Sequence, residues 1–330
     1  MDYRWLGTTG VKVSSLALGT MSFGGDADEP TSAALWATAR DAGINFIDTA
    51  DVYNNGRSEE IIGRLIGGDR DQLVLATKAY FPTGGGPNAR GTSRYHLVRA
   101  VEASLRRLGT DRVDLFYLHR WDDRTALDET LRAIDDLVTS GKILYAACSN
   151  FAAWQVAHAQ GVATARGFAP LCAVQPMYNL VKRQAEVELL PMAQALGLAV
   201  VPYSPLAGGL LTGKYAGGAR PQGSRLAHNA MYQTRYADQA YWAAADAFAG
   251  LARELGHDPA ALGVAWVGAH PAVTSVLLGA RSVEQLRAAL GATTIAIDAA
   301  LRARIGALTP EPPPATDRNE ERTANNYGSR

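Results

Sequence analysis

Short apolar runs alternate with longer helical patterns along most of this chain, and this alternation constrains the fold more than any other feature of the sequence. Most runs are apolar at consecutive positions, as in strands that are buried on both faces of a parallel sheet. Strands that alternate with helices are typical of parallel β–α units. The eight runs are Leu16–Met21, Ile44–Asp48, Leu73–Lys78, Val113–His119, Lys142–Ser149, Leu171–Gln175, Ala199–Tyr203 and Thr274–Gly279.

The segments between these runs carry helix start and stop signals. Thr31 or Ser32 is expected to cap the first helix, and Asp258 followed by Pro259 is typical of a capped helix start. Glycines follow several of the patterns, as expected after the last turn of a helix. The predicted helices are Thr31–Asp41, one opening at Ser58, Ser93–Leu108, Thr125–Thr139, Ala152–Arg166, Val187–Leu196, Tyr241–Leu255, one opening at Pro259, and Ser282–Leu290.

Two architectures fit eight parallel strands, an eight-stranded barrel and an open doubly wound sheet. An open sheet that binds a dinucleotide usually carries G-x-G-x-x-G after an early strand, and residues 19–25 do not match it. The strand count and this mismatch favour an α/β fold of the (β/α)8 or TIM-barrel type with long rim loops. Residues 3–6 and 11–16 predict an N-terminal β-hairpin. Residues 1–308 are expected to form one barrel, and 309–330 an extended or disordered tail.

Composition excludes several classes of partner. The chain has 330 residues, and 32 basic residues balance 32 acidic ones, so electrostatics give no reason to expect binding to nucleic acid or an anionic membrane. No run is long enough to span a bilayer, and no secretory signal is visible. Cys148 and Cys172 form no C-x-x-C motif. We therefore expect a cytoplasmic protein that acts on a small molecule.

Polar side chains follow the predicted strands at their C-terminal ends, where TIM barrels carry their chemistry. Asp48 ends the second run, Lys78 the third and His119 the fourth, and Tyr53 comes five residues after Asp48. Alone, the aspartate, the histidine and the tyrosine are each more typical of a cap or of packing, whereas a lysine at the end of a buried strand is harder to explain in that way. Four of them at neighbouring strand ends favour a functional site. Asp51 is interpreted as a loop residue that orients its neighbours.

These four side chains make a chemically coherent set. A buried ammonium is costly without a partner, so Lys78 is expected to pair with Asp48. Its charge near Tyr53 would lower the tyrosine pKa from about 10. Such a tyrosine can protonate a developing alkoxide, while His119 hydrogen-bonds the substrate oxygen or relays a proton. The histidine spacing predicts no metal site, and no G-x-S-x-G motif is present.

The sequence resembles the aldo-keto reductase superfamily from about residue 3 to residue 290. Several motifs occur together in one order and spacing, which makes the resemblance specific. They are GINFIDTADVY at 43–53, ATK at 76–78, VDLFYLH at 113–119, GK at 141–142, CSNF at 148–151, VQPMYN at 174–179 and YSPLAGGLLTGK at 203–214. The loop GPNARG at 86–91 is similar to the branch that contains aryl-alcohol dehydrogenase-like proteins and deoxysugar ketoreductases.

The resemblance implies a (β/α)8 barrel that binds extended NADPH and reduces aldehydes and ketones. It implies Tyr53 as general acid, supported by Asp48, Lys78 and His119. Ser149, Asn150 and Gln175 would hold the nicotinamide carboxamide, Tyr203 would stack on the nicotinamide, and Arg281 would meet the 2′-phosphate. The other implied cofactor contacts are Gly19, Thr20, Met21, Asp48, Ser204, Pro205, Leu206, Gly208, Leu210, Lys214, Gly279 and Gln285.

Two positions depart from the family pattern. Ala289 stands where an adenine-facing asparagine is common, and Ala147 precedes Cys148 where glycine is common. By position, the side chains expected near the substrate are Phe23, Tyr80 and Trp121. Residues 82–94 are expected to form a substrate-side loop. Residues 216–236 are expected to form another long loop, whose arginines Arg220, Arg225 and Arg235 are more simply interpreted as solvated.

Three functions are compatible with these observations. The leading interpretation is an NADPH-dependent carbonyl reductase. A reductase of deoxysugar-nucleotide intermediates shares the same site chemistry. A regulatory protein like the potassium-channel β subunits, which have this fold and bind NADPH, is an alternative from a different class. A homo-oligomer is compatible with all three.

Overall fold

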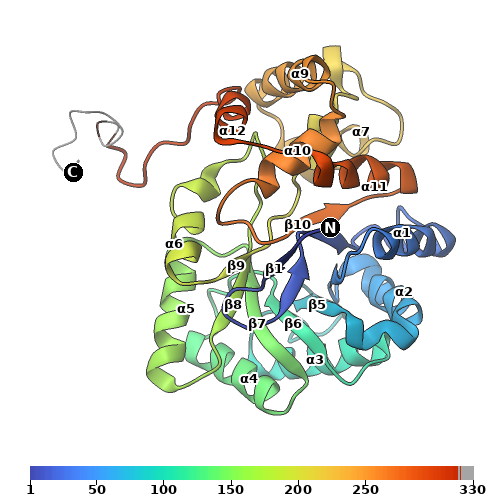
Figure 1. Cartoon of the computed structure of the whole chain (residues 1–330). Helices are drawn as coiled ribbons and strands as arrows, with labels where there is room; N and C mark the ends of the chain where they lie inside the picture. The colour runs from blue at the N-terminus through green and yellow to red at the C-terminus, as the bar shows by residue number, and fades with distance from the viewer. Residues whose placement is uncertain (319, 321–330) are drawn as a thin grey trace.

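A parallel sheet forms the centre of the molecule in the computed structural model, which describes residues 1–318 and 320. Its strands are β3 (Leu16–Gly19), β4 (Phe46–Asp48), β5 (Val74–Ala79), β6 (Val113–Leu118), β7 (Ile143–Ser149), β8 (Leu171–Gln175), β9 (Ala199–Val200) and β10 (Val276–Gly279). The strand order is β10-β3-β4-β5-β6-β7-β8-β9, and every neighbouring pair is parallel. Each of the eight apolar runs therefore coincides with a strand over most of that strand's length, and the TIM-barrel-like α/β fold is confirmed (Figure 1).

The sheet curls so that its two edges meet. Strand β10 pairs in register with β3, with Val276 opposite Leu16. On its other side, the Thr274 and Leu277 amides donate to the carbonyl oxygens of Val200 and Pro202 at 2.8 and 3.0 Å. These bonds connect β10 to the β9 segment and bring the C-terminal ends of all the strands to one rim.

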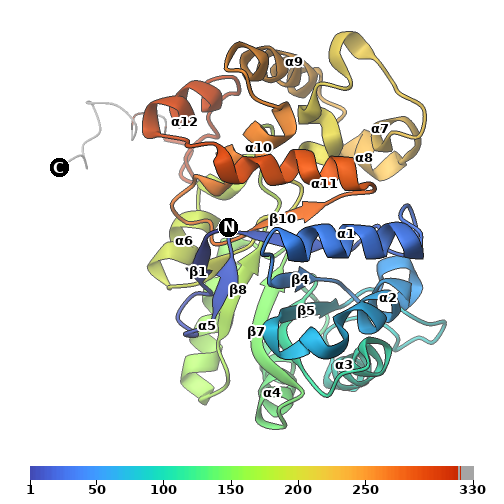
Figure 2. The same cartoon turned by 45° about the vertical axis from the view of Figure 1, so that its right-hand side comes forward.

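The α-helices lie outside the strands and cover the curled sheet (Figures 1 and 2). They are α1 (Glu29–Asp41), α2 (Arg57–Ile66), α3 (Arg94–Leu108), α4 (Leu127–Thr139), α5 (Ala153–Arg166), α6 (Leu189–Ala195), α7 (Arg225–His228), α8 (Ala230–Arg235), α9 (Gln239–Glu254), α10 (Pro259–Gly268), α11 (Val283–Leu290) and α12 (Ala299–Gly306). Short 3-10 turns add η1 (Tyr53–Gly56), η2 (Gly67–Gln72), η3 (Gln184–Glu186), η4 (Ala207–Thr212), η5 (Ala216–Gly218) and η6 (Gly291–Thr294).

Helix starts follow the capping chemistry of the sequence, with one correction. Asp258 caps α10 with Pro259 in its first turn, as predicted, and Ser93, at the start of the predicted helix Ser93–Leu108, caps α3. The first helix begins earlier than expected, because the Asp28 carboxylate accepts the Thr31 amide at 2.9 Å. Thr31 is therefore inside α1 and is not its cap. An aspartate three residues before an orphan amide competes well for this position.

The C-terminal third differs most from the sequence-based expectation. The segment 216–236 was expected to be a loop, but it contains η5, α7 and α8. Helix α12 was not predicted. Residues 309–318 contain no helix or strand. The rest of the expected tail, apart from residue 320, lies outside the described residues.

Two apolar layers hold the barrel together. Side chains that point inward fill the barrel, and alternate side chains pack between the strands and the helices. The predicted N-terminal hairpin is confirmed as β1 (Tyr3–Trp5) paired antiparallel with β2 (Lys12–Ser14). Its Leu6 and Val13 are fully buried in the inner layer, so the hairpin contributes to the core at the end of the barrel opposite the rim. Within the described residues, no helix combines the length and the apolar character needed to cross a bilayer.

Helices α2 and α3 approach closely at Gly63. A Cβ at Gly63 would lie 2.6 Å from the carbonyl oxygen of Arg107, which is backbone and cannot move aside cheaply. Gly63→Ala is therefore expected to lower the free energy of unfolding by about 1–3 kcal/mol, measured by urea denaturation. Gly250 in α9 is the matched control, because a Cβ there meets nothing within 4 Å. Gly250→Ala should raise stability by about 0.5–1 kcal/mol. Equal effects of the two substitutions would contradict the close approach.

Candidate active site at the C-terminal rim

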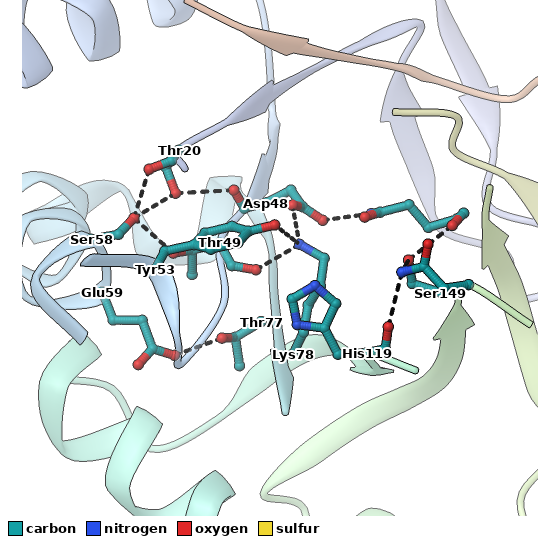
Figure 3. A network of polar contacts seen from close by, with 12 residues as sticks. Thr20, Asp48, Thr49, Tyr53, Ser58, Glu59, Thr77, Lys78, His119 and Ser149 are labelled. Atoms are coloured by element: carbon teal, nitrogen blue, oxygen red, sulfur yellow. Dashed lines mark hydrogen bonds and ion pairs between the residues drawn. The ribbon is translucent and has the colours of Figure 1, made fainter. Parts of the chain in front are cut away.

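The four predicted catalytic side chains lie together at one rim (Figure 3). Asp48 ends β4, Lys78 lies near the end of β5, and His119 directly follows β6. Tyr53 begins η1, the turn that connects β4 to α2. The side-chain amide of Asn54 donates to the carbonyl oxygens of residues 21 and 23 at 3.0 and 2.7 Å, and thereby fixes this turn against the loop after β3.

Lys78 and Asp48 form a fully buried ion pair. The Lys78 ammonium donates to Asp48 Oδ1, to the Thr49 carbonyl oxygen at 2.8 Å and to Tyr53 Oη at 3.4 Å. The second Asp48 oxygen accepts Gln175 Nε2 at 2.8 Å. All three ammonium hydrogens and both carboxylate oxygens thus have partners, as a buried pair requires.

Burial and charge act in opposite directions on Lys78. Removal from water disfavours its ammonium, but the adjacent Asp48 carboxylate and the Tyr53 oxygen outweigh that effect and raise the pKa of Lys78. Lys78 is therefore a fixed cation beside the tyrosine over the physiological pH range.

The expected lowering of the Tyr53 pKa is not found. Removal of Tyr53 from water raises its pKa, and the nearby Lys78 charge offsets this only in part. Lys78 also lies 5.0 Å from the centroid of the Tyr53 ring. The position of the Lys78 cation could be predicted from the sequence, but the degree to which the Tyr53 hydroxyl is buried could not. Tyr53 consequently keeps its proton at neutral pH.

His119 is neutral, and one of its ring nitrogens has no hydrogen-bond partner among the described residues. Burial, together with the Lys78 charge, holds the pKa of His119 well below its usual value. Its ring meets those of Tyr53 and Phe81 edge-on, at centroid distances of 5.9 and 5.0 Å. Within the described part of the chain, His119 Nδ1 has no hydrogen-bond partner. A neutral imidazole beside a tyrosine hydroxyl can donate or accept a hydrogen bond.

The polar residues predicted to hold a carboxamide form a connected group next to the ion pair. Asn150 Nδ2 donates to Ser149 Oγ and to the His119 carbonyl oxygen, both at 3.0 Å. Ser149 Oγ donates to the Gln175 carbonyl oxygen at 2.9 Å. The Tyr203 hydroxyl donates to Asn150 Oδ1 at 2.7 Å. Strands β7 and β8 and the segment after β9 therefore bring these residues together.

The segment 204–214 forms a tight backbone loop around η4. Gly208 and Gly209 have positive φ angles of 68° and 95°, and a Cβ at Gly208 would lie 2.6 Å from the ring of Tyr232. Pro205, Leu210 and Leu211 are buried. Tyr232, on α8, also acts electrostatically on Tyr53, so the segment 216–236 reaches the rim. Tyr232 was not predicted as a site residue, because it lies in a segment without a strong sequence pattern.

Three cations converge at the far end of this loop. Burial, with the charges of Arg281 and Arg225, lowers the pKa of Lys214. Arg281 Nη1 donates to the Gly223 carbonyl oxygen at 2.8 Å, and Gln285 Oε1 accepts the Arg281 amide at 3.1 Å. Arg225 was interpreted as solvated, and the structure instead places its charge within reach of Lys214. No sequence signal pointed to this contact, because residues 215–224 show no strong pattern.

The three side chains that were expected near the substrate have different surroundings in the structure. Phe23 is fully buried in the core between strands and helices, so its side chain contributes to packing. Tyr80 is 9% exposed and meets Phe81 edge-on at 5.2 Å. Trp121 is half-buried and meets Phe151 and Trp154 at 5.3 and 5.6 Å.

The remaining predicted contacts lie along the rim. Gly19 pairs with Asp48, and the Thr20 hydroxyl lies 3.0 Å from the Asp48 carbonyl oxygen. Met21 is 41% exposed, and Gly279 ends β10. In the part of the chain that the structure describes, no group of three or more His, Cys, Asp and Glu residues could hold a metal ion.

The C-terminal rim of the barrel thus carries a buried lysine–carboxylate pair beside a tyrosine hydroxyl and a neutral imidazole, an arrangement suited to proton transfer. The sequence profile of the Aldo/keto reductase family matches residues 15–309. The chain belongs to this family of oxidoreductases.

Curated relatives span nearly the whole chain. The chain is 42% identical over 323 residues to the uncharacterized oxidoreductase YrpG of Bacillus subtilis. This match covers 94% of the chain and 97% of the relative. The chain is 39% and 38% identical to probable voltage-gated potassium channel subunits beta of Oryza sativa and Arabidopsis thaliana. Those matches cover 87% of this chain and 89% of each relative.

Removal of one partner from the buried ion pair should be costly. Lys78→Met leaves the Asp48 carboxylate buried without its cation, and should lower the free energy of unfolding by about 3–5 kcal/mol. The double variant Asp48→Asn, Lys78→Met removes both charges and should recover part of that loss. Urea denaturation of the wild type and the single and double variants measures both effects. A double variant as unstable as the single one would contradict this account.

Proposed function

We propose that this protein reduces an aldehyde or ketone to an alcohol with NADPH, and that Tyr53 is the general acid. The observation that carries the proposal is the position of Tyr53 Oη, 3.4 Å from the ion-paired Lys78 ammonium. A protonated tyrosine next to a fixed cation can release its proton to a developing alkoxide, because the cation stabilises the phenolate that remains.

The other side chains support that proton transfer. Asp48 holds Lys78 in place and balances its charge in the barrel interior. Neutral His119 is available to hydrogen-bond the carbonyl oxygen and orient it toward Tyr53. The aromatic side chains of Tyr80, Phe81 and Trp121 would form the walls that exclude water on the substrate side.

The residues of the rim fit the cofactor. NADPH, when bound, supplies the hydride to the carbonyl carbon. Asn150, Ser149 and Gln175 present amide and hydroxyl groups that suit a carboxamide. These groups lie beside the tetrad, by which we mean Asp48, Tyr53, Lys78 and His119. Gly208 and Gly209 let the backbone of η4 turn tightly against Tyr232 and Lys214, and the resulting loop is proposed to follow the pyrophosphate. The remaining proposed contacts are Gly19, Thr20, Met21, Ser204, Pro205, Leu206, Leu210, Gly279 and Gln285.

The cation cluster favours NADPH over NADH. Arg225 and Arg281 both lie within electrostatic range of Lys214. Asp26 is the nearest acidic partner of Arg281, at 3.9 Å. Three cations close together repel one another, and a bound phosphate would relieve that repulsion.

A second candidate function is regulatory. Two plant relatives are named as potassium channel β subunits, and they are 39% and 38% identical to this chain. A protein of that kind would bind NADPH and a membrane partner and show little turnover. Steady-state reduction of a carbonyl panel that includes 4-keto-deoxysugar nucleotides separates the three possibilities: simple carbonyl reduction, sugar-nucleotide reduction, or binding without turnover.

We also propose that residues 1–308 form one structural unit, since β10 pairs with β3 near the start of the barrel, and that the protein is cytoplasmic. A homo-oligomer is compatible with this unit. Sedimentation of the purified chain measures its state of association.

Tyr53→Phe should abolish proton donation without loss of the cofactor. Carbonyl reduction is expected to fall by about 10²–10⁴-fold, with NADPH binding unchanged by fluorescence titration. Tyr95→Phe is the matched control, because Tyr95 is 57% exposed on α3 and contacts only Arg99 among the described polar partners. Full activity in Tyr53→Phe would rule out Tyr53 as the acid.

Arg281→Met should weaken NADPH binding selectively. The loss of one guanidinium from the cluster should raise the KM for NADPH by about tenfold or more and leave the KM for NADH little changed. Arg220→Met is the control, since Arg220 stacks on the Trp242 ring at 3.8 Å. Equal changes for the two cofactors would show that Arg281 does not read the 2′-phosphate.

A further inference from the structure

A second set of charged side chains lies directly behind the tetrad, between β5 and helices α2 and α3. Glu59 of α2 is fully buried, and Arg107 of α3 is mostly buried against it. Arg107 Nε donates to Glu59 Oε2 at 2.6 Å, and the Thr77 hydroxyl donates to Glu59 Oε1 at 2.6 Å. Glu59 therefore has a partner for each oxygen, and Arg107 is already balanced by a carboxylate (Figure 3 shows Glu59 and Thr77).

Asp51 is the carboxyl without a cation of its own. It is 1% exposed, and within the described residues neither of its side-chain oxygens has a hydrogen-bond partner of good geometry, although the adjacent Val52 amide favours its charged form. The charged groups that act on it are Glu59 from α2, Arg107 from α3 and Lys78 from β5. Arg107 is paired with Glu59 and Lys78 with Asp48. One carboxyl of this group thus exceeds the available cations.

Charge balance requires that this excess carboxyl carry a proton. An unpaired carboxylate is very costly in a buried site, and a like charge nearby increases that cost. Burial, together with the Glu59 charge, raises the pKa of Asp51 to about 8. Asp51 is thus neutral at pH 7, and it ionises within the range in which enzymes are commonly assayed.

The backbone of Asp51 connects this charge to Tyr53. The Asp51 amide donates to the Lys78 carbonyl oxygen at 3.1 Å, and the Tyr53 amide donates to that of Ala50 at 3.2 Å. Asp51 therefore lies in the short segment that extends the β4–β5 pairing and then turns into η1. A new charge under this segment would displace the turn that presents the tyrosine.

Gly56 shows how closely this turn and the buried acids are packed. Its φ is 88°, and a Cβ there would lie 2.8 Å from Cδ of Arg107. Arg107 thus reaches Glu59 by passing directly beneath η1. The buried pair and the Tyr53 turn share one packed volume, so a change of charge in one has a direct mechanical effect on the other.

We propose that Asp51 is a positioning residue that holds the Tyr53 turn in place only while its carboxyl is protonated, so that carbonyl reduction declines in mildly alkaline solution. This inference rests on the proposed role of Tyr53. Asp51 itself touches neither the reacting atoms nor Tyr53 Oη. It acts through the backbone of residues 49–53.

The test is Asp51→Asn, which keeps the shape of the side chain and cannot ionise. The activity of the variant should match the wild type within about twofold near pH 7. Near pH 9 a single ionisation leaves about a tenth of the wild type protonated, so the variant should be about tenfold more active there. Asp246→Asn, an exposed position on α9, is the control and should follow the wild-type profile. Coincident profiles of the wild type and Asp51→Asn would overturn the proposal.

A stability measurement separates this proposal from the proposed enzyme activity. A carboxyl whose pKa is raised in the folded state binds more protons folded than unfolded between about pH 4 and pH 8. The wild type should therefore lose stability relative to Asp51→Asn across that window, and the difference should level off above it. If neither protein reduces carbonyls, the proposed function fails while this measurement still tests Asp51. If the difference in the free energy of unfolding between the two proteins did not change with pH, the claim that the Asp51 carboxyl is protonated at pH 7 would be wrong.

Infrared spectra of the wild type give a readout that does not depend on whether the variant folds. A protonated carboxyl band should be present near pH 7 and lost by about pH 9.5. The absence of that change would also overturn the proposal.

Discussion

The buried pair of Lys78 and Asp48 is the interaction on which the rest of this structure depends. Two charges at the centre of an apolar barrel are tolerated only because every donor and acceptor has a partner, among them the Thr49 carbonyl oxygen and the Gln175 amide. The pair itself joins β4 and β5, and its partners come from the segment after β4 and from β8. The pair therefore fixes the relative positions of strands that contribute to the site, and it sets the electrostatic environment of Tyr53 and His119.

The fold could be predicted largely from the sequence, because eight apolar runs leave few topologies and a barrel rim collects whatever follows each strand. Asp48, Lys78 and His119 were found this way. What could not be predicted was the degree to which side chains are enclosed. The Tyr53 pKa lies above its usual value because burial outweighs Lys78, and Phe23 is packed in the core. Neither effect has a signature in spacing or composition.

Contacts between distant segments were the other gap. Arg225 lies near Lys214 only because α7 folds back over the loop after β9, and a run of glycines and arginines gave no indication of that path. The group of Asp51, Glu59 and Arg107 likewise combines a strand-end segment with two different helices. Each residue alone is an ordinary polar residue of a loop or helix, and only the three together show an excess of negative charge.

The pairing of β10 with β3 has a consequence for how the molecule forms. Leu16 and Val276 lie near opposite ends of the chain, yet they occupy neighbouring places in the sheet. Forming such a contact closes a long loop, and the lost chain entropy is offset only after the strands have paired. Contacts of long sequence separation therefore slow folding. During synthesis, one edge of β3 stays exposed until β10 has been made and can pair with it. The nascent chain therefore carries an open sheet edge until β10 has been synthesised, and aggregation competes with folding during that interval.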